Sequence, residues 1–225
     1  MEELKKQLQE KGYTFFKMQD YPEFKDEYEY YKKYICSSEN NLLKYINSVR
    51  FDSESLKLNI NCESFEEAEE RVNQERLKIT KYDKSHSQYW FYGEPIVITN
   101  SFRPLINKIV NIFYNENSEE YKHILSITYY KPECFLKAHR DGQTGTRLCA
   151  VLIYLNDEEY KPEWGGNIVF EGTESVNPTY GNIAILDFKQ GNCLHEVKKV
   201  IDGYGRYAIL DFISSEDVGN KPNYY

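Results

Sequence analysis

The chain has 225 residues, of which 40% are hydrophobic and 16% aromatic. This composition supports a packed core of one sizeable domain and excludes a disordered chain. The formal net charge of −8 disfavours nucleic acid as a partner, because a duplex-binding surface needs clustered basic residues.

The N-terminal stretch and the cysteines indicate the compartment. Residues 1–12 are charged throughout and lack the apolar region of a signal peptide. The sequence also lacks an apolar run of about 18 residues, which a bilayer-spanning helix needs. Five widely spaced cysteines without a C-x-x-C pair favour reduced thiols over disulfides or a structural zinc site. We therefore expect a soluble, cytoplasmic protein with no membrane partner.

Charged amphipathic segments before residue 120 predict helices. The predicted helices span Glu2–Lys11, Glu23–Ile35, Glu39–Val49, Ser64–Ile79 and Arg103–Tyr114. The fourth begins with a capping box, in which Ser64 is followed three residues later by Glu67.

After residue 120, short apolar runs between glycine and aspartate turns predict strands. They span Ile124–Tyr130, Leu148–Leu155, Asn167–Phe170, Asn182–Phe188 and Arg206–Ile213. Many short strands predict an α+β protein with a double-stranded β-helix (jelly roll), against which a helical N-terminal half packs. We expect a single domain over residues 1–225, with a mainly helical part at 1–120, a jelly-roll catalytic core at 121–215 and a polar tail at 216–225.

Two candidate metal ligands, His139 and Asp141, lie in the segment KAHRDG. Residues i and i+2 of an extended chain point to the same side, so this segment can supply two ligands. His195, the only histidine downstream, can supply a third, which completes the two-histidine, one-carboxylate triad of open iron sites. The alternative is a surface or hydrogen-bonded role, which is usual for a single histidine and which we assign to His86 and His123.

The segments around these residues extend the pattern. In chain order they are Tyr130-Lys131-Pro132, Leu136, His139-Arg140-Asp141, Ile153-Tyr154-Leu155-Asn156, Trp164-Gly165-Gly166, His195-Glu196-Val197 and Gly205-Arg206-Tyr207-Ala208-Ile209. This ordered set resembles the 2-oxoglutarate/Fe(II)-dependent dioxygenases, in particular their prolyl-hydroxylase-like branch, over about residues 124–213. The first 120 residues carry no family signal.

The resemblance implies roles for six residues. The iron ligands would be His139, Asp141 and His195. Arg206 and Tyr154 would bind the distal carboxylate of 2-oxoglutarate, and Tyr130 would lie near its iron-chelating end.

The resemblance also implies a reaction. Dioxygen and 2-oxoglutarate would be consumed, with ascorbate as the reductant, to hydroxylate an unactivated C–H bond and release succinate and carbon dioxide. The substrate would be a prolyl or other residue in a peptide or protein, or a free amino acid or related small molecule. Related halogenases lack a carboxylate at the position of Asp141, so hydroxylation is expected.

Strand periodicity is a separate argument for an anion pocket. Arg206 and Tyr154 fall on strand faces that are otherwise apolar, with these neighbours: Ala208, Leu210 and Phe212 for Arg206, and Leu148, Ala150 and Leu152 for Tyr154. An interior arginine is costly unless an anion meets it, and a carboxylate fits the guanidinium. The alternative protein partners, Asp187 and Asp211, alternate onto the opposite faces of their own strands.

Weaker candidates keep two interpretations each. Gly165-Gly166 permits a close backbone approach or forms a plain turn. Arg147 and Arg103 can hold a substrate carboxylate or be ordinary exposed arginines. The aromatic segment 84–93 can cover the substrate or pack as a loop on the core.

Three alternatives to the hydroxylase stay open. A non-catalytic jelly-roll module could bind a metal or ligand without turnover. A zinc hydrolase could use the same three ligands but would not need the interior Arg206 and Tyr154. A dioxygenase acting on nucleic acid is disfavoured by the acidic charge.

Overall fold

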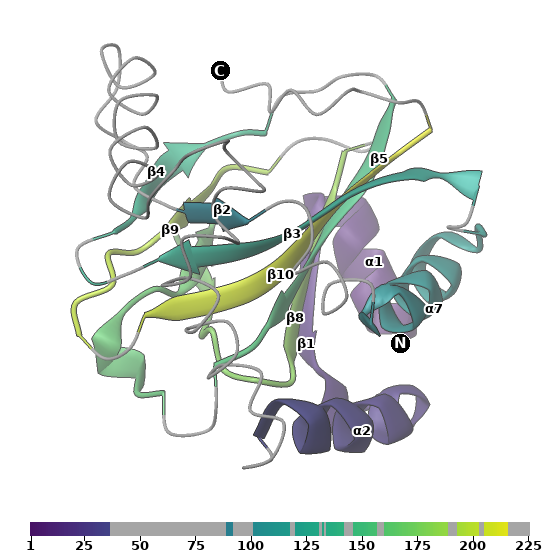
Figure 1. Ribbon diagram of the computed structural model, residues 1–225. Helices are drawn as coiled ribbons and strands as arrows, with labels where there is room; N and C mark the ends of the chain where they lie inside the picture. Colours follow the sequence, from purple (N-terminus) through teal and green to yellow (C-terminus); the bar gives the residue numbers. More distant parts are fainter. Residues whose placement is uncertain are drawn as a thin grey trace, which may run out of the picture.

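The computed structural model describes residues 1–36, 89–91, 101–117, 120–130, 132, 134–141, 146–156, 160–188, 193–202 and 205–215. The helices predicted at 39–49 and 64–79, most of the aromatic segment 84–93 and the tail 216–225 lie outside these ranges. Within them, the chain forms two antiparallel β-sheets and three α-helices (Figure 1).

The larger sheet has six strands in the order β1-β8-β5-β10-β3-β2, and the smaller sheet has four in the order β4-β9-β6-β7. The strands of the larger sheet are β1 (Tyr13–Lys17), β2 (Tyr89–Phe91), β3 (Lys122–Tyr130), β5 (Arg147–Tyr154), β8 (Asn182–Asp187) and β10 (Arg206–Ser214). Those of the smaller sheet are β4 (Leu136–His139), β6 (Ile168–Phe170), β7 (Glu174–Val176) and β9 (His195–Val197). This arrangement confirms the predicted double-stranded β-helix of an α+β protein.

The two sheets face each other and bury an inner apolar cluster between them. Its strand residues come from both sheets: Tyr13, Ala150, Leu152, Tyr154, Ala184, Leu186, Ala208 and Leu210 from the larger, and Ile168, Phe170 and Val176 from the smaller. Every second residue of β5, β8 and β10 faces this cluster, because side chains alternate along a strand. Side chains on the inner faces of both sheets therefore point into one shared space, where a functional site can form.

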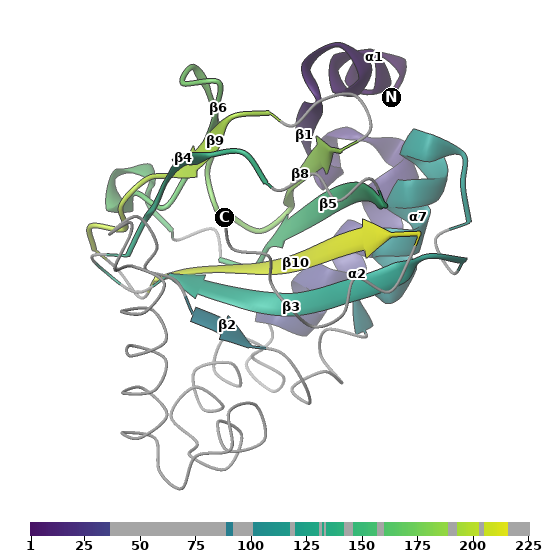
Figure 2. The same cartoon turned by 90° about the horizontal axis from the view of Figure 1, so that it is seen from above.

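Helices cover the outer face of the larger sheet, where α1 (Glu2–Lys11), α2 (Lys25–Cys36) and α7 (Arg103–Tyr114) gather on one side (Figure 1 and Figure 2). α1 and α7 have their predicted bounds. α2 begins two residues later than predicted, because the 3-10 turn Pro22–Phe24 precedes it. Among the residues that the structure describes, no helix is long and apolar enough to cross a membrane.

The N-terminal part also contributes a strand, β1, which the sequence did not predict. β1 forms one edge of the larger sheet and pairs along its whole length with β8. It follows α1 directly, after Gly12 ends that helix with φ at 75°. Five residues are too few for periodicity to distinguish a strand, and the three- to four-residue strands β4, β7 and β9 escape prediction for the same reason.

One predicted side-chain direction is wrong. Leu148 does not share the inner face with Tyr154 but packs with Val151 in the outer cluster beneath the helices. The reason is a register shift between Ile213 and Ser214, where β10 pairs with the start of β5. Such an irregularity moves the neighbouring side chains to the other face of the sheet.

The side chains of Cys134, Cys149 and Cys193 are buried and form no disulfide with one another. The fold is therefore held by packing of the sheets and helices rather than by cross-links among these residues.

Candidate metal centre and adjoining arginine pocket

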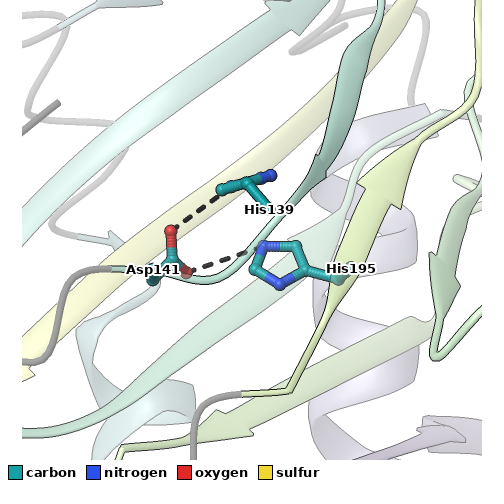
Figure 3. A group of neighbouring side chains, drawn as sticks. All are labelled: His139, Asp141 and His195. Carbon is teal, nitrogen blue, oxygen red and sulfur yellow. Dashed lines mark ion pairs between the residues drawn. The ribbon is translucent and has the colours of Figure 1, made fainter. Parts of the chain in front are cut away.

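His139 and His195 meet on the smaller sheet, where β4 ends and β9 begins. The antiparallel register places them opposite each other, and their ring centroids are 4.3 Å apart. Asp141 follows β4 by two residues, and its carboxylate lies 3.5 Å from His139 Nε2 and 3.6 Å from His195 Nε2 (Figure 3). One ligand atom from each residue lies within 4.8 Å of the others. The three residues singled out in the sequence are thus brought together in a group that can hold one metal ion.

Backbone carbonyls orient both imidazoles. His139 Nδ1 lies 2.8 Å from the carbonyl oxygen of Lys137, and His195 Nδ1 lies 3.1 Å from that of Cys193. When Nδ1–H donates to a carbonyl, the neutral ring keeps a lone pair on Nε2, on the side of Asp141. Two such nitrogens and a carboxylate are the donor set of the open iron triad.

The pKa values of the three groups respond to burial and to one another. Burial lowers the pKa of His195 and favours its neutral ring. Burial alone would raise the pKa of Asp141, but its hydrogen bond to His139 and the charges of both histidines bring it below the usual value. For His139, the Asp141 carboxylate outweighs burial and raises the pKa. A metal ion therefore meets an ionised Asp141 and competes with a proton for His139.

Arg206, the first residue of β10, is 1% exposed. Its guanidinium carbon lies 4.6 Å from the ring centroid of Tyr130 and 5.1 Å from that of Tyr154. In the part of the chain that the structure describes, its Nε and Nη2 atoms and the Tyr154 hydroxyl are buried without a hydrogen-bond partner. Two N–H donors and one hydroxyl fit a carboxylate, which a guanidinium can bind in bidentate fashion.

Both tyrosines keep their hydroxyl protons. Burial raises the pKa of Tyr130 and of Tyr154, and the Arg206 guanidinium opposes part of this rise. A protonated phenol can donate a hydrogen bond to an anion. The group formed by Arg206, Tyr130 and Tyr154 therefore offers hydrogen-bond donors and contains no acidic side chain.

The acids considered as partners for Arg206 lie on the outer face of the larger sheet, as the strand period predicts. Asp211 Oδ2 is 2.6 Å from His123 Nδ1, and both side chains are buried. Asp187 is buried too and shares a strand face with Ile183 and Ile185, which pack under the helices. His123 thus has the hydrogen-bonded role expected for it, whereas His86 lies outside the described residues.

Gly165 and Gly166 allow a loop to approach Arg206. They follow the 3-10 turn Pro162–Trp164 and have φ values of 78° and 71°. A Cβ on Gly165 would collide with the carbonyl oxygen of Lys199, and one on Gly166 would lie 3.3 Å from Cβ of Arg206. Of the two interpretations of this pair, close backbone approach is the one observed.

The two arginines considered for a substrate carboxylate lie on opposite faces of the larger sheet. Arg103 begins α7, and its charge acts on the buried Asp211 of the outer face. Arg147 begins β5, and its guanidinium lies 4.8 Å from the ring centroid of Phe212, which packs against the inner cluster. Of the two, Arg147 is on the side of the metal centre.

An aromatic stack beside His195 was not predicted. Tyr13 and Phe15 of β1 both stack on Phe170, with ring centroids 4.4 Å and 6.1 Å apart, and Phe170 lies 6.4 Å from His195. The stack joins the two sheets next to a candidate ligand. No sequence signal reveals it, because the strand that supplies two of its rings was itself missed.

Comparisons with known proteins bear on the fold and on the protein family. The model of the 2OG-Fe(II) oxygenase superfamily matches residues 125–214, whereas no curated protein matches the chain. A Pseudomonas putida prolyl-4-hydroxylase has a TM-score of 0.51 at 13% identity, over 96% of this chain and 98% of that chain. A Trichoplax adhaerens prolyl hydroxylase, solved with a hypoxia inducible factor peptide fragment, has a TM-score of 0.54 at 16% identity, over 95% of this chain and 88% of that chain. These two structures share the fold of this chain, and the family match over residues 125–214 supports a 2OG-Fe(II) oxygenase.

Proposed function

We propose that the chain is an Fe(II)- and 2-oxoglutarate-dependent hydroxylase whose iron ligands are His139, Asp141 and His195. The convergence of two Nε2 atoms and one carboxylate supports this assignment. When bound, iron and 2-oxoglutarate together supply the oxidant for a C–H bond, with succinate and carbon dioxide as co-products and ascorbate as the reductant. The two carbonyl contacts at Nδ1 hold each imidazole in the tautomer that ligation needs.

The observation that carries the proposal is the buried guanidinium of Arg206. We assign to it the distal carboxylate of 2-oxoglutarate, which its Nε and Nη2 would bind while the Tyr154 hydroxyl donates a further hydrogen bond. Tyr130, whose ring packs on the same guanidinium, is assigned to the chelating end of the co-substrate. A zinc hydrolase would leave this anion pocket without a use.

Asp141 favours hydroxylation over halogenation. A halogenase needs the carboxylate position free for a halide, whereas the Asp141 carboxylate lies on the side of both imidazoles here. The low pKa of this carboxyl keeps it available as an anionic ligand.

The proposed substrate is an amino-acid side chain, in a peptide or protein or as a free amino acid. The two structures named above are prolyl hydroxylases, one of them bound to a peptide, which supports this class. We also propose that residues 1–120 and 121–215 form one domain, because β1 pairs with β8 inside the larger sheet.

The experiment is a turnover assay with Fe(II), ascorbate and 2-oxoglutarate. We expect succinate from the wild-type protein and a product 16 Da heavier from a responsive amino acid or peptide. Asp141→Ala should abolish both, whereas Asp20→Ala, which removes an exposed carboxylate from the 3-10 turn Met18–Asp20, should leave both unchanged. Absence of succinate from the metal-loaded wild type, with all substrates, would contradict the proposal and favour a non-catalytic binding module.

A further inference from the structure

Asn156 follows β5 and is fully buried at the point where the chain leaves the β5–β10 ladder. The last pair of that ladder is Tyr154 with Ala208. Beyond it, the carbonyl oxygen of Asn156 accepts a hydrogen bond from the N–H of Tyr180, and Asn156 forms an isolated bridge with Thr179. The backbone of Asn156 is therefore bonded to the segment that precedes β8, although its side chain is bonded to β10.

The side-chain amide of Asn156 holds β10 on both sides of Arg206. Its Nδ2 donates to the carbonyl oxygen of Gly205 at 2.6 Å, and its Oδ1 accepts from the N–H of Tyr207 at 2.8 Å. The N–H of Leu155 still donates to the carbonyl oxygen of Tyr207 at 3.1 Å. The amide thus takes over the pairing of β10 where the backbone of β5 stops.

These two contacts need a short side chain with one donor and one acceptor. The carboxamide of asparagine is planar and carries the same two groups as a peptide unit, so it can replace a residue of the missing strand. In the antiparallel register, position 156 lies opposite Arg206, two residues beyond the pair of Tyr154 with Ala208. An aspartate at this position would lack the donor, and an alanine would lack both groups.

The other sides of Arg206 are closed by packing. On the opposite edge of β10, Arg206 pairs with Tyr130 of β3, and the rings of Tyr130 and Tyr154 lie against its guanidinium. The loop at Gly166 passes so close that a Cβ there would lie 3.3 Å from Cβ of Arg206. A side chain enclosed in this way cannot offset a displaced backbone by changing its rotamer. The position of the guanidinium therefore depends on the position of the backbone.

We propose that Asn156 is a positioning residue, which holds the backbone at Arg206 so that the guanidinium meets the distal carboxylate of 2-oxoglutarate. The inference rests on the proposed function and adds a residue that acts through Arg206. Bidentate binding of a carboxylate needs N···O distances of about 2.7–2.9 Å, and supporting hydrogen bonds hold such groups within about 0.5 Å of the productive position. Both amide contacts are made within the fold, so the position is set before the co-substrate binds.

The test is a calorimetric titration of 2-oxoglutarate into Mn(II)-loaded wild type, Asn156→Ala and Asn182→Ala. Asn182, the first residue of β8, is the matched control and is 6% exposed. Its Nδ2 donates to the carbonyl oxygen of Asn177 and to Oγ1 of Thr179, both at 2.9 Å. Each variant loses a buried side-chain amide with two hydrogen bonds, so both should unfold at a lower urea concentration than wild type.

We expect the Kd for 2-oxoglutarate to rise about tenfold or more in Asn156→Ala, the usual effect of losing a group that supports a ligand-binding residue. In Asn182→Ala, this Kd should change by less than about twofold, and the Kd for Mn(II) should change by less than about twofold in both variants. In turnover, Asn156→Ala should have a raised KM for 2-oxoglutarate and retain kcat when 2-oxoglutarate is saturating.

A second measurement uses the wild type and does not depend on the folding of a variant. The N–H of Tyr207 donates to Asn156, whereas Ile209 pairs with Ile153 inside the ladder. Hydrogen exchange at the Tyr207 amide should be slow in the Mn(II)-loaded protein before 2-oxoglutarate is added, within about tenfold of the rate at Ile209. This result would show that the backbone at Arg206 is held in place without the co-substrate.

Three results would overturn the inference. They are an unchanged Kd for 2-oxoglutarate in Asn156→Ala, an equal rise in both variants, and a Tyr207 amide that becomes protected only after 2-oxoglutarate is added. A wild type that does not bind 2-oxoglutarate would contradict the proposed function itself. A wild type that binds it as tightly as Asn156→Ala does would contradict only the role of Asn156.

Discussion

The two faces of strand β10 bury charge in different ways. On the outer face, Asp211 meets His123 at 2.6 Å, so the protein supplies a partner of opposite charge. On the inner face, Arg206 is equally buried but meets two tyrosine rings, and two of its N–H donors have no acceptor within the described residues. A charge paired within the fold is structural, whereas a buried charge that the fold leaves incomplete indicates a ligand.

The largest effect is expected from Arg206→Met, which should separate binding from stability. Loss of the guanidinium should raise KM for 2-oxoglutarate by about 30-fold or more, because buried charge pairs contribute several kcal/mol. The unliganded variant should be as stable as wild type or more stable, since an uncompensated buried charge becomes apolar. Steady-state kinetics and urea unfolding measure the two quantities. A marked loss of stability in the unliganded variant would indicate that a protein group partners Arg206.

His123→Leu should have the reverse outcome. Removing the partner of Asp211 should lower the free energy of unfolding by about 3 kcal/mol and leave 2-oxoglutarate binding unchanged. This loss of stability should be near the low end of the range for breaking a buried ion pair. Burial already raises the pKa of Asp211, so its carboxylate can take up a proton more readily. Adding Asp211→Leu to this variant should recover stability in urea unfolding. Weakened co-substrate binding in His123→Leu would show that the two faces of β10 are coupled.

Tyr154→Phe should have a smaller effect, confined to the inner face. Among the described residues its hydroxyl has no hydrogen-bond partner, so stability in urea should not fall. Affinity for 2-oxoglutarate should drop about tenfold, the effect of losing one hydrogen bond to a charged group. An unchanged affinity would remove Tyr154 from the proposed anion pocket.

The last prediction concerns pH. The Asp141 carboxylate outweighs burial and raises the pKa of His139, so the proton is held more tightly than by an ordinary histidine. A metal ion must displace this proton to bind His139. The affinity of the protein for the metal should therefore decrease as pH falls, starting above about 6.5, by up to about tenfold per pH unit. Mn(II) titrations at pH 8, 7 and 6 measure this dependence. His123→Leu should show the same pH dependence of metal affinity, because His123 lies on the outer face of β10. A different slope would contradict the separation of the two faces.

Long alternating strands made the inner face predictable from the sequence. β10 and β5 are long enough for their period to place Arg206 and Tyr154 inside and Asp211 outside, and the structure agrees. The alternation predicted the wrong face for Leu148. The register shift in its pairing with the end of β10 cannot be read from the alternating pattern of β5 itself.

Contacts between distant segments could not be predicted. His123 and Asp211 are 88 positions apart, and no local pattern marks them as partners. The stack of Tyr13 on Phe170 depends on β1, whose five residues follow a helix without a strand signal. The triad was recoverable because His139 and Asp141 share one short segment and His195 alone lies downstream.

The most direct test of the account is a calorimetric titration of 2-oxoglutarate into Mn(II)-loaded wild type, His123→Leu and Arg206→Met. Mn(II) takes the same nitrogen and oxygen ligands and allows binding to be measured without turnover. We expect one bound 2-oxoglutarate per chain, with similar affinity in wild type and His123→Leu and with affinity lost in Arg206→Met. Equal affinity in all three proteins would contradict it.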